Sequence, residues 1–169
     1  MRVAIVVLVL ALAGHTSRAA DTSDATYAPL WLYNGAWQVT QDGKSPEQLK
    51  NECALVGMYF ACQQIVNGKP SELLIFVPAN KPGHYYTQSV MPEGRAGGRG
   101  DLEISGDHWT YTSTWDEGGK TTYYRTTNVF TGKTRIHFEQ AESSNNKDWK
   151  VTSSGDEVHI SGGPMKVAH

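Results

Sequence analysis

The feature that most constrains the fold is a succession of short segments rich in Val, Ile, Thr, Tyr, Phe and Trp, which begins after Gly35. Clusters of Gly, Pro, Asn and Asp separate these segments, and no stretch shows the 3.6-residue period of a long helix. Such a pattern predicts β-strands joined by tight turns. Strands are expected at 36–41, 50–56, 59–67, 71–78, 84–91, 99–105, 108–115, 121–130, 134–141, 147–153 and 156–161, and the last two could be one interrupted hairpin.

Two places could hold a helical turn. Residues 30–33 (Leu-Trp-Leu-Tyr) are too few for a stable helix and are expected to form a short N-terminal helical turn that plugs the fold. Residues 42–50 could hold another, with Ser45 as N-cap and Pro46 at the first position. Ten or eleven short sequential strands favour an all-β, antiparallel up-and-down barrel of about ten strands, or else a sandwich. A curled half-barrel would give the same sequence pattern.

A hairpin turn at Gly106-Asp107 fixes one inward face. A two-residue loop pairs Ile104 with Trp109 and Leu102 with Tyr111, which places these four apolar side chains on one face. The polar and charged residues between them then fall on the opposite face. This separation indicates strands with one buried and one solvated side.

The two cysteines can be placed by the same arithmetic. A two-residue turn at Gly57-Met58 pairs Val56 with Tyr59 and brings Cys53 opposite Cys62 in a non-hydrogen-bonded pair. Such pairs place the Cα atoms about 4.5 Å apart, which is within disulfide range. The prediction is a Cys53–Cys62 cross-strand disulfide. The alternative, a redox-active thiol pair, lacks the usual Cys-x-x-Cys spacing.

The N-terminal segment has the pattern of a secretory signal peptide. A basic start (Met1-Arg2), an apolar run over 3–14 and small residues at Ser17 and Ala19 predict cleavage between Ala19 and Ala20. The alternative, a membrane anchor, would need about 20 apolar residues. The expected organisation is a signal peptide at 1–19, a flexible leader at 20–29, a barrel domain at 30–161 and a C-terminal tail at 162–169. The expected location is the periplasm or the extracellular space, where disulfides persist.

The charge balance after cleavage excludes some partners. The 15 Lys and Arg residues include Arg2 and Arg18, so 13 remain against 17 acidic residues. This acidic balance gives no basic patch for a nucleic-acid partner. No later segment is apolar for long enough to predict a membrane span in the mature protein.

Three short motifs resemble those of a known family: Leu32 to Trp37 with its Gly-x-Trp, the turn over 106–111, and residues 125–132 (Arg-Thr-Thr-Asn-Val-Phe-Thr-Gly). Over residues 30–161 the chain resembles the lipocalin-like (calycin) barrels, and more closely a lipocalin-like family of bacterial exported proteins without a settled activity. The resemblance implies a cup that holds a small, partly hydrophobic or amphipathic molecule. Trp37 would then either close the barrel end or simply fill its core.

Six residues are the candidates for lining such a cup. The apolar ones are Trp37, Trp109, Tyr111 and Phe138, and the polar ones are Tyr124 and Arg125. A five-residue loop at 116–120 would turn Arg125 inward, where a buried guanidinium needs an anionic partner, whereas a four-residue loop would turn Tyr124, Thr126 and Asn128 inward.

Other motifs do not define a site. His137 and Glu139 share the strand face opposite Phe138, and no spacing supplies a third metal ligand, so no metal and no cofactor are expected. Residues 94–100 are glycine-rich but lack the Gly-Lys-Ser/Thr ending of a P-loop, which favours a flexible loop over an anion-binding lip. No catalytic motif nominates an enzyme. A barrel isomerase or hydrolase using Arg125, Tyr124 or a histidine, and a structural module of the cell envelope, remain as alternatives.

Overall fold

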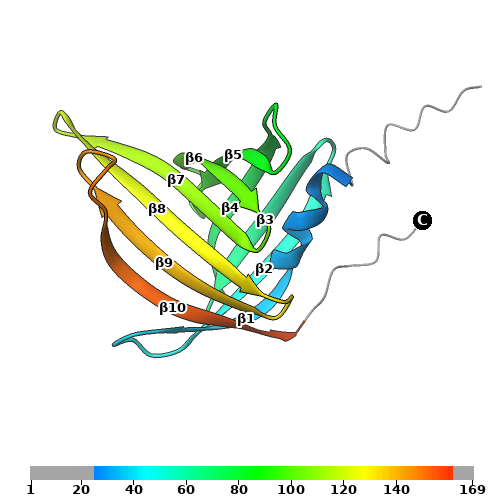
Figure 1. The fold of residues 1–169 in the computed structure, drawn as a ribbon. Coiled ribbons are helices and arrows are strands. Elements are labelled where there is room, and N and C mark those ends of the chain that lie inside the picture. The colour runs from blue at the N-terminus through cyan, green and yellow to red at the C-terminus, as the bar shows by residue number, and fades with distance from the viewer. Residues whose placement is uncertain (1–24, 162–169) are drawn as a thin grey trace, which may run out of the picture.

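The computed structural model describes residues 25–161, which form ten β-strands preceded by a 3-10 helix, η1 (Ala28–Tyr33) (Figure 1). The predicted signal peptide, the first half of the leader (residues 20–24) and the C-terminal tail lie outside the described residues. The strands are β1 (Gly35–Gln41), β2 (Glu47–Val56), β3 (Tyr59–Val66), β4 (Lys69–Pro78), β5 (His84–Val90), β6 (Ala96–Ser105), β7 (His108–Glu117), β8 (Lys120–Thr131), β9 (Arg135–Ser143) and β10 (Lys150–Ser161).

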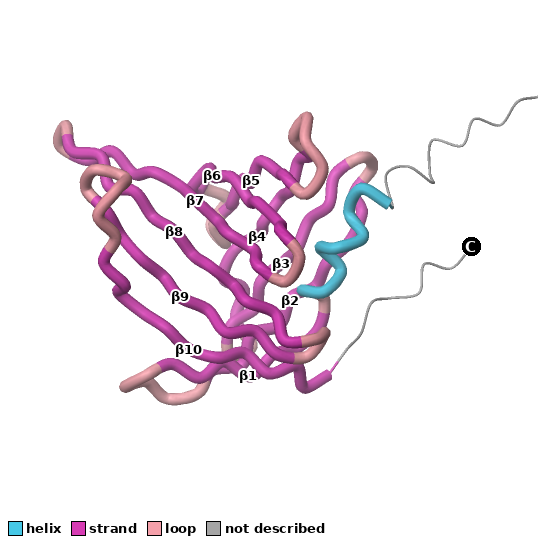
Figure 2. The backbone as a smooth tube through the Cα atoms, in the orientation of Figure 1, coloured by secondary structure: helices cyan, strands magenta, loops and turns pink. Residues whose placement is uncertain are grey.

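The strands close into a single antiparallel barrel. Each strand pairs with the next one along the chain, and β1 pairs with β10 from Ala36–Ser161 to Gln41–Gly155 (Figure 2). This topology confirms the predicted up-and-down barrel, and it excludes the sandwich and the half-barrel. Within residues 25–161 no helix has the length and apolar character needed to cross a membrane.

The hairpin registers follow the predicted turns. Ile104 pairs with Trp109 and Leu102 with Tyr111 across the Gly106-Asp107 turn. Trp109 and Leu102 are buried, while residues on the other face, such as Glu103, are exposed. The register was predictable because two-residue turns leave no freedom in the pairing of the flanking strands.

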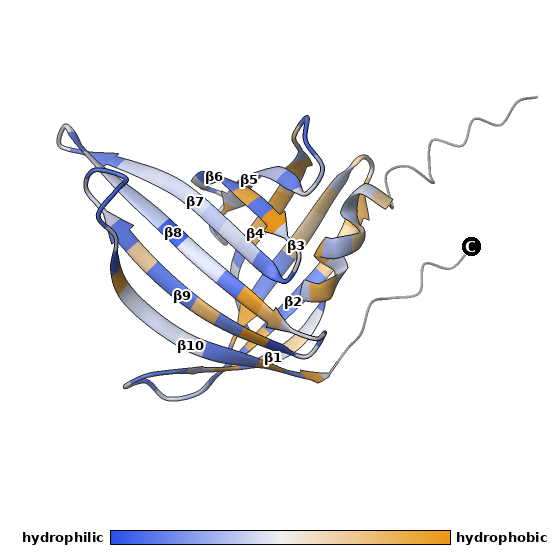
Figure 3. Cartoon of the chain, viewed as in Figure 1, coloured by the Kyte–Doolittle hydropathy of each residue, from blue (hydrophilic) through white to orange (hydrophobic). Residues whose placement is uncertain are grey.

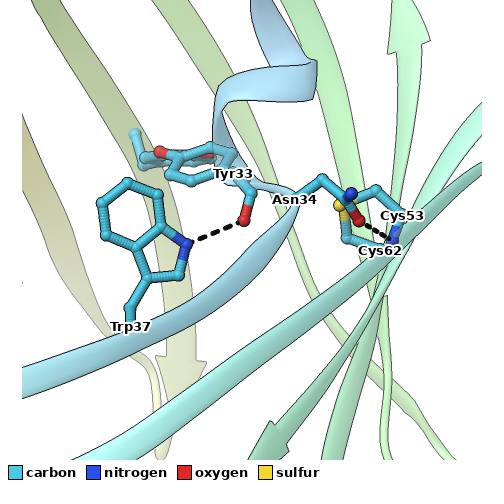
Figure 4. The surroundings of a disulfide bond; sticks show 6 residues. Tyr33, Asn34, Trp37, Cys53 and Cys62 are labelled. Carbon is cyan, nitrogen blue, oxygen red and sulfur yellow. Dashed lines mark hydrogen bonds between the residues drawn. A yellow bond between two sulfur atoms is a disulfide. The ribbon is translucent and has the colours of Figure 1, made fainter. Parts of the chain in front are cut away.

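The Cys53–Cys62 disulfide is present, with the two Cα atoms 4.0 Å apart and both residues buried (Figure 4). Val56 pairs with Tyr59, as the Gly57-Met58 turn predicts. The backbone N–H of Cys53 also donates a hydrogen bond to the side chain of Asn34, at 3.0 Å. The disulfide therefore lies where β2 meets the segment that connects η1 to β1.

Loss of this disulfide is expected to cost about 2–3 kcal/mol, because the bond closes a short loop and restricts the unfolded chain only modestly. The test is urea unfolding of the Cys53→Ala/Cys62→Ala double variant. The double variant should lose about as much free energy of unfolding as the wild type loses when its disulfide is reduced. Two unfolding curves with the same midpoint in oxidised wild type and double variant would contradict it.

Three sequence-based expectations are wrong. Residues 42–50 hold no helical turn, because β2 already begins at Glu47 and pairs with β1 through Val39. Residues 147–153 and 156–161 are not separate strands but one strand, β10, with a register shift between Val151 and Ser153. The glycine-rich stretch is largely strand, since β6 begins at Ala96.

The hydrophobic core gathers at the end of the barrel that η1 covers (Figure 3). Leu30 of η1 is fully buried, and the hydroxyl of Tyr27 donates a hydrogen bond to the carbonyl of Met58, at 3.0 Å, in the β2–β3 turn. Tyr85 on β5 donates to the carbonyl of Thr26, at 2.6 Å. These contacts tie the helical turn across one barrel end, as the predicted plug requires.

Trp37 forms the floor beneath this plug. Its indole N–H donates to the carbonyl of Tyr33 at 2.9 Å (Figure 4). Its ring also meets His159 edge-on, with 4.8 Å between the centroids. Gly35, two residues before it, has φ of +128°, and an added Cβ would lie 2.5 Å from Nε2 of His159. The glycine of the Gly-x-Trp motif is therefore required for the close approach of the chain to β10.

Candidate functional site

The turn between β7 and β8 decides which side chains face the barrel interior. Only Gly118 and Gly119 lie between the paired residues Glu117 and Lys120. The loop is therefore shorter than either predicted alternative, but its parity is that of the four-residue loop. Tyr124, Thr126 and Asn128 consequently share the inner face with Trp109 and Tyr111, and Arg125 lies on the outer face.

A cavity of about 440 Å³ lies inside the barrel above the core. The apolar residues of its lining are Val39, Leu49, Cys62, Val66, Leu74, Phe76 and Phe138. The polar residues of its lining are Tyr33, Gln41, Glu47, Asn51, Gln64, Glu72, Tyr111, Thr126, Asn128, Gln140 and Glu157. The interior is therefore hollow and amphipathic rather than filled by side chains.

The hydroxyl of Tyr33 is the centre of a hydrogen-bond network at the base of the cavity. It accepts a bond from the hydroxyl of Tyr111 at 3.0 Å and another from Nδ2 of Asn128 at 2.8 Å. The Tyr33 ring also packs edge-on against Trp109, at 4.8 Å between centroids. Burial raises the pKa values of both tyrosines well above their usual range, so both hydroxyls keep their protons at neutral pH.

Two buried amide oxygens in the cavity wall lack partners. Asn51 is 3% exposed and Asn128 is 7% exposed, and the Oδ1 atom of each has no hydrogen-bond partner among the described residues. An unpaired buried carbonyl oxygen costs about 1–3 kcal/mol. Both residues line the cavity, so its wall contains two buried oxygens that lack a hydrogen-bond donor.

Two carboxyl groups face the same space. Burial raises the pKa of Glu157 on β10 to about 7, and within the described residues its carboxyl has no hydrogen-bond or ion-pair partner. Burial also raises the pKa of Glu72 on β4, while a hydrogen bond with Ser89 lowers it in part. At neutral pH, Glu157 is therefore poised between its neutral and charged forms.

The six residues nominated from the sequence fall in different places. Tyr111 and Phe138 line the cavity. Trp37 and Trp109 are buried in the core below it and do not reach its wall. Tyr124 lines a smaller extension of about 160 Å³, which shares Glu72, Leu74, Tyr111 and Thr126 with the main cavity.

Arg125 does not face the interior. Its guanidinium carbon lies 4.2 Å from the ring centroid of Trp149, in a cation–π contact on the outer face. An anion site inside the barrel centred on Arg125 is therefore not formed. The physical reason is the even parity of the short glycine turn between β7 and β8.

A larger hollow of about 800 Å³ opens through the barrel wall, and its lining includes Val77, Tyr86 and Tyr123 of the outer face as well as Ser113 and Tyr124 of the inner face. It forms where β6 and β7 diverge, since their pairing ends at Gly100 and Ser113 although both strands continue. Despite its size, this hollow contains none of the unpaired buried atoms and neither of the carboxyls with raised pKa values. The interior cavity is therefore the candidate site.

Comparison with known proteins adds a limited likeness. No family model matches the sequence, and no curated protein matches it. The structure is similar to the crystal structure of Rv2717c from M. tuberculosis, with 13% sequence identity, a TM-score of 0.45, and coverage of 80% of this chain and 98% of that chain. It is also similar to EF1p2_mFAP2b bound to DFHBI, with 13% identity, a TM-score of 0.32 and the same coverage.

These TM-scores are too low to carry an argument about function, and the barrel assignment depends on the strand pairing. No group of three or more potential metal ligands occurs within residues 25–161. His137 instead lies on the outer face, with Nδ1 3.0 Å from the carboxylate of Asp156.

Sequence reasoning missed Glu72, Glu157 and Asn51 as cavity residues. Asn51 had a usable signal, because it lies two residues before Cys53 and therefore shares the inner face with the disulfide. Glu157 had no usable signal, because the prediction divided the strand that carries it into 147–153 and 156–161. Side chains alternate along β4, so Glu72 lies on the same face as Phe76. This alternation predicts that Glu72 points inward but does not predict that it is buried.

Proposed function

We propose that this protein is an exported, lipocalin-like barrel that binds a small, partly hydrophobic molecule in its interior cavity. The observation that carries the proposal is the hollow interior itself, closed at one end by η1 and lined by unpaired buried acceptors at Asn51 and Asn128. In a barrel serving only as a scaffold, side chains would fill this space.

The dimensions and chemistry of the cavity fit such a ligand. Small-molecule pockets in proteins have volumes of about 300–1,000 Å³, with mostly apolar walls and a few placed polar groups. The Leu74, Phe76 and Phe138 side chains offer apolar surface, and the Tyr33 network offers polar contacts beside Phe138, which pairs with Asn128. A ligand with both apolar and polar groups matches this mixed lining.

The proposed location is the periplasm or the extracellular space. The Cys53–Cys62 disulfide is of the kind that persists in oxidising compartments. The predicted signal peptide at 1–19 accounts for export, and we assign the ligand-binding domain to residues 30–161. These two features support each other, since a disulfide formed in a reducing compartment would be short-lived.

One observation favours a second candidate function, that of a barrel enzyme. A carboxyl with a pKa of about 7, such as that of Glu157, is suited to general acid–base catalysis at neutral pH. The cavity also brings the Tyr111 hydroxyl within electrostatic reach of this carboxyl. Catalysis would be supported if the wild type converts a bound ligand into a product and Glu157→Gln still binds that ligand without converting it.

The test of binding uses the neutral fluorescent probe N-phenyl-1-naphthylamine and a matched pair of variants. In Val39→Trp the added indole enters the cavity, whereas in Gln38→Trp it lies on the exposed outer face of the same strand. We expect the probe to fluoresce in the wild type and in Gln38→Trp. Binding to Val39→Trp should be at least about tenfold weaker, because a single large side chain removes much of the ligand contact area.

Equal affinity in all three proteins would place the probe outside the cavity. Absence of probe fluorescence in the wild type, together with no binding of the phenylethyl ligands described below, would overturn the proposal.

A further inference from the structure

All the charged side chains that line the cavity are acidic. The lining contains the carboxyls of Glu72 and Glu157, together with the exposed carboxyl of Glu47, and no Lys, Arg or His side chain. Carboxylates only accept hydrogen bonds when ionised, and each carries a negative charge. Arg99 lines the smaller extension, but it is exposed and donates to the side chain of Gln88, at 2.9 Å.

A second and independent feature points the same way. The two unpaired buried atoms of the wall, Oδ1 of Asn51 and Oδ1 of Asn128, are both acceptors. The Nδ2 group of Asn128 is already used, because it donates to Tyr33. A ligand that satisfies these atoms must therefore bring N–H or O–H donors, and a carboxylate or phosphate could not.

The two inner carboxyls lie on opposite sides of the barrel. Glu157 is on β10 and Glu72 is on β4, with β1, β2 and β3 between them on one side. The charges of both raise the pKa of Tyr111, so both lie within electrostatic reach of its hydroxyl. The space between these carboxyls and the Tyr33 network is therefore the most acceptor-rich part of the cavity.

We propose that the ligand of this cavity is a small amphipathic amine, whose ammonium group pairs with Glu157 and donates to the unpaired oxygens of Asn51 or Asn128. This inference rests on the proposed binding function and names its ligand class. The apolar part of the amine packs against Leu74 on β4, across the barrel from Glu157 on β10. A buried carboxylate without a partner is costly, and a ligand cation supplies the missing partner.

This pairing makes binding dependent on pH. The apo carboxyl has a pKa of about 7, so at pH 6 about nine-tenths of it is protonated. A bound ammonium favours the charged form, so at pH 6 binding releases nearly one proton, and affinity rises by about tenfold between pH 6 and pH 8.

Other titratable groups face Glu157 from the elements around it. These are Glu47 on β2, Glu72 on β4, Tyr33 on η1, Tyr111 on β7 and His159 on β10 itself. The tyrosines remain neutral over this pH range, and ionisation of Glu72 adds to the attraction for a cation. The direction of the pH dependence is therefore set by the carboxyls.

The experiment is calorimetric titration with 2-phenylethylamine and with 2-phenylethanol, which differ only in ammonium against hydroxyl. In the wild type at pH 8 the amine should bind at least about tenfold more tightly than the alcohol. Glu157→Gln should remove most of this preference, because the ammonium group loses its ionic partner while the alcohol has no charge to pair. Glu139→Gln, which makes the same charge change on the exposed outer face of β9, should behave as the wild type.

A second measurement on the wild type does not depend on any variant. At pH 6, the binding enthalpy of the amine in buffers of different ionisation enthalpy should report the release of nearly one proton. An alcohol affinity equal to that of the amine, or amine binding without proton release, would overturn the amine assignment and leave the binding function standing. Binding of N-phenyl-1-naphthylamine without binding of the amine would do the same.

Discussion

Trp37→Ala is expected to lower the free energy of unfolding by about 3–5 kcal/mol, which is the usual cost of deleting a fully buried indole. Trp37 is 0% exposed, and it contacts both the last residue of η1, through the carbonyl of Tyr33, and His159 on β10. Its removal leaves a void where the plug meets the barrel seam between β1 and β10. Both the packing of η1 and the closure of the barrel depend on this contact.

The matched control is Trp115→Ala. Trp115 is 57% exposed near the end of β7, so its loss should change stability by less than about 0.5 kcal/mol. Urea unfolding followed by circular dichroism measures both variants. If Trp37→Ala were no less stable than Trp115→Ala, the role of Trp37 as the floor of the barrel would be wrong.

Glu157→Gln is expected to stabilise the protein at pH 8 by about 3 kcal/mol. Folding raises the pKa of this carboxyl from its ordinary 4.5 to about 7. The folded protein therefore holds the proton more tightly than the unfolded chain does. Stability is greatest below pH 4.5, declines as the pH rises from 4.5 to 7, and is lowered by about 3 kcal/mol above that range.

The side-chain amide introduced by Glu157→Gln cannot ionise, so the stability of this variant should not decline between pH 4.5 and pH 7 in this way. At pH 5 it should differ from the wild type by less than about 1 kcal/mol, because most of the decline lies above that pH. Thermal unfolding at pH 5 and pH 8 tests the prediction, with Glu139→Gln as the control on the outer face. Parallel stability profiles of wild type and Glu157→Gln would show that the carboxyl is solvated rather than buried.

The parts of the fold that were predictable depend on short turns. Gly57-Met58 and Gly106-Asp107 each fix a register, so the disulfide and the inner face of β6 and β7 follow by counting residues. The barrel itself follows from the number and order of the strands. Closure was not predictable, because the pairing of β1 with β10 joins the two ends of the described chain and leaves no local signal.

The main error in the strand prediction was the division of β10 near a glycine. The predicted strands 147–153 and 156–161 leave Gly155 between them, but Gly155 lies inside β10, where an added Cβ would be 2.2 Å from the carbonyl oxygen of Thr40 and 2.8 Å from Cζ of Phe138. Its role is close packing rather than chain reversal. Dividing β10 at this residue hid the alternation that turns Glu157 inward, and the most informative residue of the cavity was therefore missed.

The facing of β8 shows a similar limit. One residue more or less in the turn at Gly118-Gly119 would exchange Tyr124 and Arg125 between the two sides of the wall. Sequence reasoning could state both outcomes but had no physical ground for choosing, because several loop lengths satisfy the same glycine signal. The structure resolves the choice in favour of an inward Tyr124 and an outward Arg125.

The most direct test of a ligand-binding interior is an NMR measurement of contacts between methyl groups and bound 2-phenylethylamine. The account predicts intermolecular NOEs from the phenyl ring to the inward methyls of Val39, Leu49 and Leu74. It predicts none to the outward methyls of Val77 and Val151. NOEs confined to Val77, which lines the larger hollow of about 800 Å³, would contradict the account.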